Sequence, residues 1–302
     1  MNLKFAFQEF ISDREYKELS ARSINNYEQT FKQFFAYCVE QEIVNTDDVT
    51  ASIIKNFLIT CQRNGNNAGS INFKLRNLKA IFSFFLEQEI IKENPAKKVP
   101  FVKNNPTIQV FKDEHIDQML KYYRRLRMRE HDFHAVRDST IINVLISTGL
   151  RLGELCSMKW SKVDLVNQEM VIFGKARTDV TIEIADSLKS DLDQYKLTCM
   201  QQFKKNLPEY VFVNLQGKRL TENAVKCIFK RLSKVMSFKD VRLSAHSFRH
   251  YYCSKMVQNM NAFEVQDLMR HKSVSTTQRY VHLFRNDLKE KNNKFNPLNQ
   301  FK

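Results

Sequence analysis

Cysteine is sparse in this sequence, and its spacing argues against two kinds of stabilising site. The six cysteines, at positions 38, 61, 156, 199, 227 and 253, are far apart and include no Cys-x-x-Cys pair. Neither a zinc cluster nor a disulfide framework is therefore indicated. We predict reduced, mostly buried thiols and a cytoplasmic protein.

Long apolar runs are also missing. No stretch approaches the roughly 20 apolar residues that a membrane span requires. The first ten residues, MNLKFAFQEF, have no long apolar stretch after Lys4. Export and membrane insertion are therefore not expected.

Positive charge is abundant, and most of the surplus lies in one part of the chain. The 302 residues carry 48 Lys and Arg against 33 Asp and Glu, a net charge of +15. Residues 1–106 hold 14 basic and 12 acidic side chains, whereas residues 107–302 hold 34 and 21. Such a surplus favours a polyanionic partner, because binding to phosphates releases their counterions. On charge alone, many other basic proteins fit equally well.

The first hundred residues show the three- and four-residue spacing of apolar side chains that predicts helices. The stripes run through Ile24, Tyr27, Phe31, Phe34, Phe35 and Cys38, then Ile53, Ile54, Phe57, Leu58 and Cys61, then Leu75, Leu78, Ile81, Phe82 and Phe85. Thr50 and Ser70 are the predicted N-caps of the second and third stripes. We therefore expect a small helical bundle.

Three prolines between positions 94 and 106 mark the end of this bundle. Each lacks an amide hydrogen and disfavours helix in the residue before it, so we interpret residues 94–110 as the region that joins two domains. We predict a helical domain over residues 1–100, a linker over 101–110 and a second domain over 111–302.

The second domain is expected to be mainly helical with a small β-sheet. Helical patterns occupy residues 112–147, 220–237, 244–260 and 262–270, whereas 170–174 and 180–184 show the patterns of strands. The polar turn between those two strands makes them a β-hairpin, and residues 210–214 are a candidate further strand. The predicted fold is therefore mainly α, with an N-terminal helical bundle followed by a mixed α/β domain.

Four separated segments of the second domain carry side chains suited to one task, and the first is TGLRLGEL at residues 148–155. Gly149 allows a sharp turn that presents Arg151 at the start of the next helix. Glu154 lies three residues further on, where it shares a helical face with Arg151 and can orient the guanidinium. Taken alone, the segment also fits an ordinary surface Arg-Glu pair.

The second and third segments add a lysine, a histidine and another arginine. Lys175 lies on the hairpin turn, where an amine can protonate a leaving oxygen, although turn lysines are more often simply solvated. In HSFRH, residues 246–250, the three-residue step places His246 and Arg249 on one helical face, where both can meet one phosphate. His250 points about a hundred degrees away and is predicted to be structural.

The fourth segment, RHKSVSTTQRYVH at residues 270–282, places His271 nine residues before Tyr280. Together the four segments resemble the sequence boxes of the tyrosine recombinase or phage integrase family, including its Xer-like members. The residues that carry this resemblance are Arg151, Lys175, His246, Arg249, His271 and Tyr280. It extends over nearly the whole chain, and its departure is Arg270, where the family usually has glycine.

The resemblance implies a fold, an activity and a role for each of these residues. Residues 1–100 would form a SAM-like core-binding domain, and residues 111–302 a catalytic domain with a C-terminal tail. The activity would be site-specific cleavage and rejoining of DNA, for example in the integration of phage or other mobile elements. By resemblance, Tyr280 is the nucleophile that forms a 3′-phosphotyrosine, Arg151, Arg249 and His271 hold the phosphate, His246 accepts a proton or positions the group that does, and Lys175 protonates the departing 5′ oxygen.

The same resemblance implies the partners. They are double-stranded DNA recombination sites, further copies of the chain in a homotetramer on two DNA sites, and accessory DNA-bending proteins, with no membrane. No metal ion and no nucleotide cofactor are implied.

Two alternatives share the fold. One is a type IB topoisomerase-like enzyme with the same chemistry, and the other is a catalytically silent DNA-binding protein. The presence of all six candidate residues argues against the silent protein, because a lost activity is expected to erode at least one of them. A metal-dependent transposase would need clustered carboxylates, and no such trio stands out in the sequence.

Overall fold

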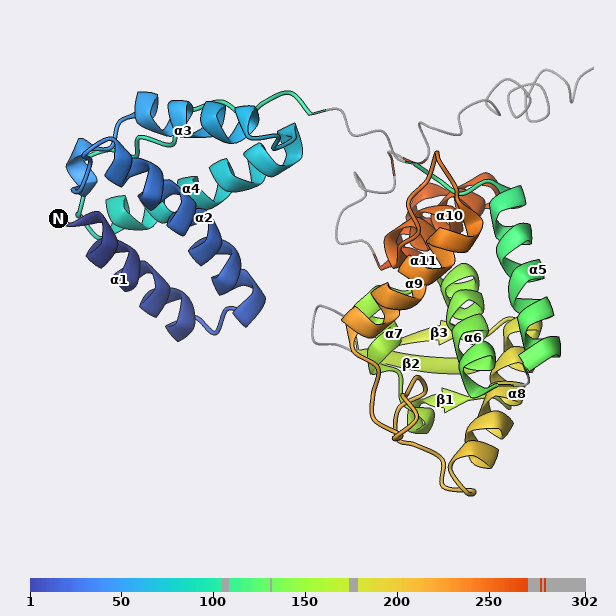
Figure 1. Ribbon diagram of the computed structural model, residues 1–302. Helices are drawn as coiled ribbons and strands as arrows, with labels where there is room; N and C mark the ends of the chain where they lie inside the picture. Colours follow the sequence, from blue (N-terminus) through green and yellow to red (C-terminus); the bar gives the residue numbers. More distant parts are fainter. Residues whose placement is uncertain (105–108, 131, 174–178, 271–277, 279, 281–302) are drawn as a thin grey trace, which may run out of the picture. The chain divides into compact units, whose positions relative to one another are not determined.

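The computed structural model describes residues 1–104, 109–130, 132–173, 179–270, 278 and 280 (Figure 1). The chain divides into two compact units, Met1–Thr107 and Ile108–Lys302, called unit 1 and unit 2 below, and each has its own apolar core. Within the described residues, no helix combines the length and apolar character that crossing a bilayer requires.

Unit 1 is a helical bundle, as its apolar spacing predicted. Its helices are α1 (Leu3–Tyr16), α2 (Ala21–Glu40), α3 (Ala51–Arg63) and α4 (Ala68–Glu87), with a short 3-10 helix at Thr46–Asp48. Helix α4 packs against the other three. The core contains the fully buried rings of Phe10, Phe34, Phe82 and Phe85, each of which stabilises the bundle by roughly 1.5–3 kcal/mol through burial.

Side chains cap all four helices of unit 1, and of the two caps predicted from the sequence one is correct. The Thr50 side chain caps α3 by accepting the N–H of Ile53. The cap of α4, however, is Asn67, whose side-chain oxygen accepts the N–H of Ser70 at 2.9 Å. The prediction of Ser70 as the cap was wrong because an equally good capping residue stands one turn earlier.

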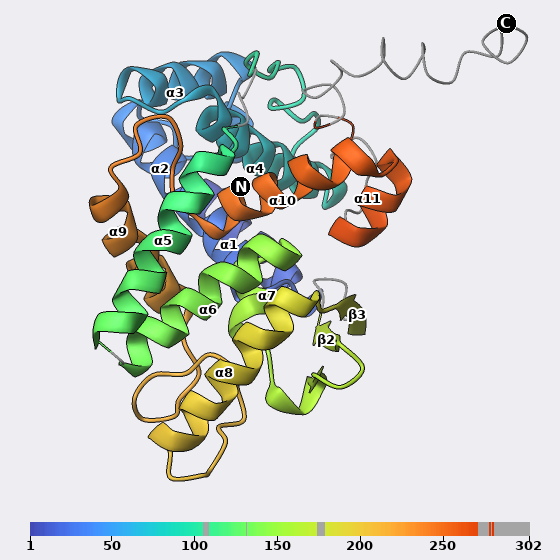
Figure 2. The ribbon, with the colours of Figure 1, turned by 90° about the vertical axis from the view of Figure 1, so that its right-hand side faces the viewer.

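Unit 2 is built around helix α6 (Phe133–Thr148), which packs against α5 (Asp113–Glu130), α8 (Asp186–Gln202) and α10 (Ala245–Asn259). The remaining helices of the unit are α7 (Leu152–Ser157), α9 (Glu222–Met236) and α11 (Ala262–Met269), with a 3-10 helix at Trp160–Lys162. Helices α10 and α11 lie side by side (Figure 2). The helices predicted after residue 220 are confirmed, and the helical region predicted over 112–147 is two helices.

The small sheet of unit 2 contains the predicted β-hairpin. Strands β1 (Val163–Asp164), β2 (Glu169–Phe173) and β3 (Asp179–Glu183) pair antiparallel in that order, with Ile172 opposite Val180. Residues 210–214 form isolated bridges but no regular strand within the described structure. The predicted fold class, mainly helical with a small sheet, is confirmed.

The cysteines are thiols, as predicted. Five are buried and Cys227 on α9 is exposed, and none of the six, all of which are described, forms a disulfide. Burial raises the pKa of Cys38 to about 12.

Candidate active site

The turn that joins α6 to α7 requires glycine. Helix α6 ends at Thr148, and Gly149 follows in the left-handed conformation with φ 58° and ψ 27°. A Cβ on Gly149 would lie 2.6 Å from Cδ1 of Tyr252, closer than side-chain atoms pack. The turn places Arg151 as the N-cap of α7, so the predicted presentation of this arginine at a helix start is confirmed.

We predict that Gly149→Ala destabilises unit 2 more than Gly217→Ala does. Both glycines have positive φ, so alanine costs about 1–2 kcal/mol at either position. At Gly217 the added Cβ would meet its nearest atom, Cε1 of Phe203, at an ordinary 3.8 Å, whereas at Gly149 the clash with Tyr252 adds about 1–3 kcal/mol. Urea unfolding of both variants measures the difference, and equal losses would contradict the steric argument.

Glu154 is a buried carboxylate that holds Arg151 at two points. It lies on the first turn of α7 with only 5% of its side chain exposed. Its Oε2 accepts the backbone N–H of Arg151 at 2.9 Å, and its Oε1 accepts Nη1 of Arg151 at 2.7 Å. Burial acts to raise the pKa of Glu154, but these bonds and the charge of Arg270 outweigh it, so the pKa lies below its ordinary value.

Arg249, on the second turn of α10, is almost completely buried. Its Nη1 donates to the carbonyl oxygen of Gly149 at 2.8 Å, and its Nη2 donates to that of Met269. The guanidinium therefore joins the end of α6 to the end of α11. Burial, with the nearby charges of Arg151 and Arg270, lowers the pKa of Arg249 to about 10, which leaves it charged at neutral pH.

A third arginine completes what we call the arginine cluster, namely Arg151, Arg249 and Arg270 with Glu154. The Nη2 of Arg270 lies 3.3 Å from Oε2 of Glu154, and the Arg270 carbonyl oxygen accepts Nη2 of Arg151 at 2.9 Å. Among the described residues, Glu154 is the carboxylate that pairs with Arg151 and Arg270, and its charge also acts on Arg249. Three buried or half-buried cations therefore share one anion, an arrangement that favours binding of a further anion.

Tyr280 lies beside this cluster. Its side chain is buried against Cys253, Val265 and Met269, and only 4% of it is exposed. The hydroxyl is hydrogen-bonded to Nδ1 of His250, and the charge of Tyr280 acts on the pKa of Arg249. The ring of His250 in turn contacts the ring of His246, with centroids 4.0 Å apart. A tyrosine hydroxyl, two imidazoles and the cluster are therefore gathered at α10 and α11.

His246 is expected to titrate below the ordinary histidine range. Burial, then the charges of Arg249 and Arg151, lowers its pKa, so the imidazole is neutral and able to accept a proton at neutral pH. We predict that Arg249→Met raises this pKa, because it removes a cation while keeping the site filled. NMR titration of the histidine ring protons measures the shift. Arg231→Met, at an exposed position of the same unit, should leave it unchanged, and an unmoved His246 pKa in Arg249→Met would contradict the electrostatic cause.

The comparisons with known proteins agree with this geometry. The model of the phage integrase family matches residues 109–287, and that of the phage integrase N-terminal SAM-like domain matches residues 7–89. The chain belongs to the phage integrase family. The resemblance noted in the sequence is therefore confirmed at the level of family and fold.

Similar proteins include a tyrosine recombinase and two solved lambda integrase structures. The tyrosine recombinase XerD of Staphylococcus aureus is 25% identical over 292 residues, which cover 93% of this chain and 94% of the relative. A lambda integrase(75-356) dimer bound to a COC′ core site has a TM-score of 0.76 at 16% identity, covering 93% of this chain and 95% of that one. A lambda integrase tetramer bound to a Holliday junction has a TM-score of 0.73 at 17% identity, covering 93% and 77%. At these identities the two structures show a shared fold.

The structure brings together five of the family-type residues that the sequence singled out, Arg151, Glu154, His246, Arg249 and Tyr280. Lys175 and His271 lie outside the described residues. The sequence did not predict two further groups of the site, the guanidinium of Arg270 and the imidazole of His250. A structural role had been predicted for His250. The four-residue step from His246 to His250 was the available signal, because it places the two rings one above the other on a helix.

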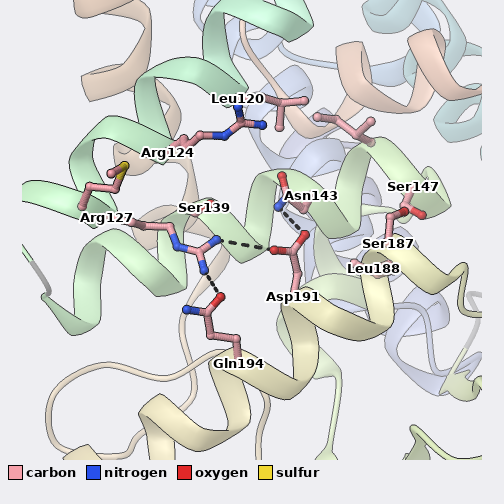
Figure 3. A pocket seen from close by; sticks show the side chains of 12 residues that line it. Leu120, Arg124, Arg127, Ser139, Asn143, Ser147, Ser187, Leu188, Asp191 and Gln194 are labelled. Carbon is pink, nitrogen blue, oxygen red and sulfur yellow. Dashed lines mark hydrogen bonds and ion pairs between the residues drawn. The ribbon is translucent and has the colours of Figure 1, made fainter.

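Unit 2 also has a groove of about 670 Å³ between α5, α6 and α8 (Figure 3). At its centre Asp191 accepts hydrogen bonds from Asn143 at 2.7 Å and from Arg127 at 3.4 Å. None of the residues that line the groove belongs to the arginine cluster. Among the described residues, no group of three or more His, Cys, Asp or Glu side chains is arranged to hold a metal ion.

Proposed function

We propose that this protein is a site-specific recombinase that cleaves and rejoins double-stranded DNA through a covalent 3′-phosphotyrosine intermediate. The observation that supports this most strongly is the buried surplus of positive charge beside a tyrosine hydroxyl. Guanidiniums offer planar pairs of donors that fit two oxygens of one phosphate. A phosphodiester repels nucleophiles through its own charge, so neutralising that charge next to a nucleophile is what DNA cleavage requires.

In the proposed reaction, Arg151 and Arg249 bind the nonbridging oxygens of the scissile phosphate, together with His271. The oxygen of Tyr280 attacks the phosphorus as its hydroxyl proton passes to a base, and the bond from phosphorus to the 5′ oxygen breaks. Lys175 gives the departing 5′ oxygen its proton. A 5′ hydroxyl from another strand then attacks the phosphotyrosine, which restores a phosphodiester and releases the tyrosine.

Two imidazoles are candidates for the base. His246 has the position that the family resemblance assigns to a proton acceptor or positioning group, and its lowered pKa keeps it neutral. His250 is hydrogen-bonded to the Tyr280 hydroxyl. The orienting role of Glu154 is supported by its two bonds to Arg151.

The proposal extends to the domains and partners. Residues 1–100 would bind the core of the DNA site, residues 101–110 would link the domains, and residues 111–302 would cut. A homotetramer on two DNA sites is supported by the fold shared with the lambda integrase tetramer bound to a Holliday junction. Neither a divalent metal nor ATP enters the proposed chemistry, because both steps exchange one phosphoester for another.

The test is to trap the covalent intermediate without knowing the DNA site in advance. The purified protein is incubated in EDTA and without ATP with sheared genomic DNA from the organism that carries the gene, then denatured with SDS. Protein-linked fragments are collected and sequenced. We expect the fragments to share one short site with inverted repeats and to be joined to the protein through their 3′ ends. Because a blocked 3′ end resists 3′ exonucleases, only a 5′ exonuclease should degrade the linked strand.

The other outcomes exclude the proposal. Linkage to 5′ ends, or no linked DNA at all, would reject a 3′-phosphotyrosine recombinase. A protein that binds the recovered site but joins no DNA would be the silent alternative. Relaxation of supercoiled plasmid without exchange between two sites would identify the topoisomerase-like alternative.

A further inference from the structure

Arg270 has a backbone conformation that is unfavourable for an arginine. It ends α11 as the C-cap, with φ 54° and ψ 46° in the left-handed region. Side chains with a Cβ adopt this region at a cost that glycine avoids. An arginine at this position therefore needs a compensating contribution from its side chain.

The side chain of Arg270 is also placed where a cation is costly. It is only 10% exposed, and its Nε has no hydrogen-bond partner in the described structure. Its Nη1 makes a local bond to the carbonyl oxygen of Leu268 at 3.3 Å. The remaining interaction is the ion pair with Glu154, at 3.3 Å. Burying a guanidinium with an unsatisfied donor costs free energy, so its effect on neighbouring groups is the feature to examine.

The neighbour that Arg270 affects is Arg151, which it contacts by two routes. Its carbonyl oxygen accepts Nη2 of Arg151, and its guanidinium binds the same carboxylate that accepts Nη1 and the backbone N–H of Arg151. Arg151, Glu154 and Arg270 therefore form a closed ring of contacts. Loss of the Arg270 guanidinium would leave the backbone bond to Nη2 of Arg151 in place, but Glu154, which accepts Nη1, would be held by Arg151 alone. The Arg151 guanidinium would then be fixed less firmly at its Nη1 end.

We infer that Arg270 is a positioning residue that fixes the Arg151 guanidinium through Glu154, in a site where this family usually has glycine. The expected effect of Arg270 on DNA cleavage rests on the proposed function. Its expected effect on the orientation of Arg151 does not. The inference predicts that glycine at position 270, which suits the left-handed backbone of this turn better than arginine, slows DNA cleavage.

The decisive variant is Arg270→Gly, because glycine relieves the left-handed strain and removes only the side chain. Ser237→Gly is the matched control, since Ser237 is also a left-handed C-cap in unit 2, on α9, with φ 52°. Both variants should melt no lower than the wild type. In the cleavage arm, single-turnover formation of the covalent adduct is measured on a nicked duplex carrying the site recovered from trapped fragments.

We expect Arg270→Gly to cleave about 10- to 100-fold more slowly at saturating DNA, since a guanidinium misplaced by a fraction of an ångström binds the transition state poorly. Ser237→Gly should cleave at the wild-type rate. Arg270→Lys, which keeps the cation, and methylguanidine added to Arg270→Gly should each restore part of the rate. Wild-type cleavage by Arg270→Gly, or no recovery from either form of rescue, would overturn the inference.

A second arm needs no DNA. In protein with ¹⁵N-labelled arginine, the Arg151 signals are assigned from their loss in Arg151→Lys. A guanidinium whose two Nη groups are both firmly held rotates slowly about its Cζ–Nε bond, so the Nη protons of Arg151 should be resolved in the wild type and in Ser237→Gly. In Arg270→Gly the carboxylate that accepts Nη1 has lost its second partner, so these protons should exchange faster and average. Unchanged signals would overturn the inference even if the wild type cleaves DNA. If the wild type forms no adduct, the proposed function fails while this arm still decides the role of Arg270.

Discussion

Tyr280→Phe is expected to abolish covalent attachment to DNA while leaving folding and DNA binding nearly unchanged. The substitution removes the proposed nucleophilic oxygen and nothing else, because phenylalanine fills the same space against Cys253, Val265 and Met269. Loss of the hydrogen bond to His250 costs about 0.5–1.5 kcal/mol of folding stability. SDS-stable adducts on the recovered DNA site measure the chemistry, and a gel-shift titration measures binding.

Tyr251→Phe provides the matched control for Tyr280→Phe. Tyr251 lies on α10, and its hydroxyl donates to Asp113 at 2.9 Å, so its removal also deletes one hydrogen bond of unit 2. This variant should form adducts at close to the wild-type rate. An adduct that persists in Tyr280→Phe would show that another residue is the nucleophile.

Arg249→Lys is expected to slow cleavage by about 100- to 1000-fold, the usual effect of removing a donor aimed at transition-state charge. Lysine keeps the positive charge but offers a single donor centre. It cannot bind the carbonyl oxygens of Gly149 and Met269 together, as Arg249 does, nor present two donors to a phosphate. DNA affinity should change much less, because many other contacts to phosphates contribute to it. Single-turnover cleavage and a salt-dependent binding titration separate the two effects.

The control for Arg249→Lys is Arg231→Lys. Arg231 belongs to the same unit and pairs with a carboxylate, Asp138, at 3.2 Å, but its side chain is 67% exposed. A conservative change at this position should affect neither cleavage nor binding measurably. If Arg249→Lys lost binding and cleavage in equal proportion, its role would be structural.

Much of the fold follows from local patterns, and the failures have physical causes. The apolar stripes of α2, α3 and α4 and the helical patterns after residue 220 made the positions of those helices predictable, whereas α1 was not predicted. Helix α8 was not predicted, because the exposed apolar side chains of Leu197 and Met200 interrupt the helical spacing of its buried apolar residues. The candidate strand at 210–214 is apolar because Val211 and Phe212 are buried in the core, not because a neighbouring strand pairs with it.

The site was predictable where its geometry is local. The turn at Gly149 and the pairing of Arg151 with Glu154 depend on residues within one helical turn. The four-residue step from His246 indicated that the two rings lie together, but the hydrogen bond of His250 to Tyr280 was not predictable, because it spans 30 residues. The sequence likewise marked Arg270 as a departure from the family, but its ion pair with Glu154 spans 116 residues. Contacts at such separations depend on how α7, α10 and α11 pack together. A short sequence pattern does not predict that packing.

The long-range anchoring of Arg151 has a consequence for protein synthesis. Arg151 leaves the ribosome 119 residues before the carbonyl oxygen of Arg270 that fixes its Nη2, and Arg249 precedes its own acceptor, Met269, by 20 residues. When unit 1 and most of unit 2 have left the ribosome, the guanidiniums of Arg151 and Arg249 therefore still lack these hydrogen-bond acceptors. Translation itself delays the assembly of the site until residue 270 has emerged.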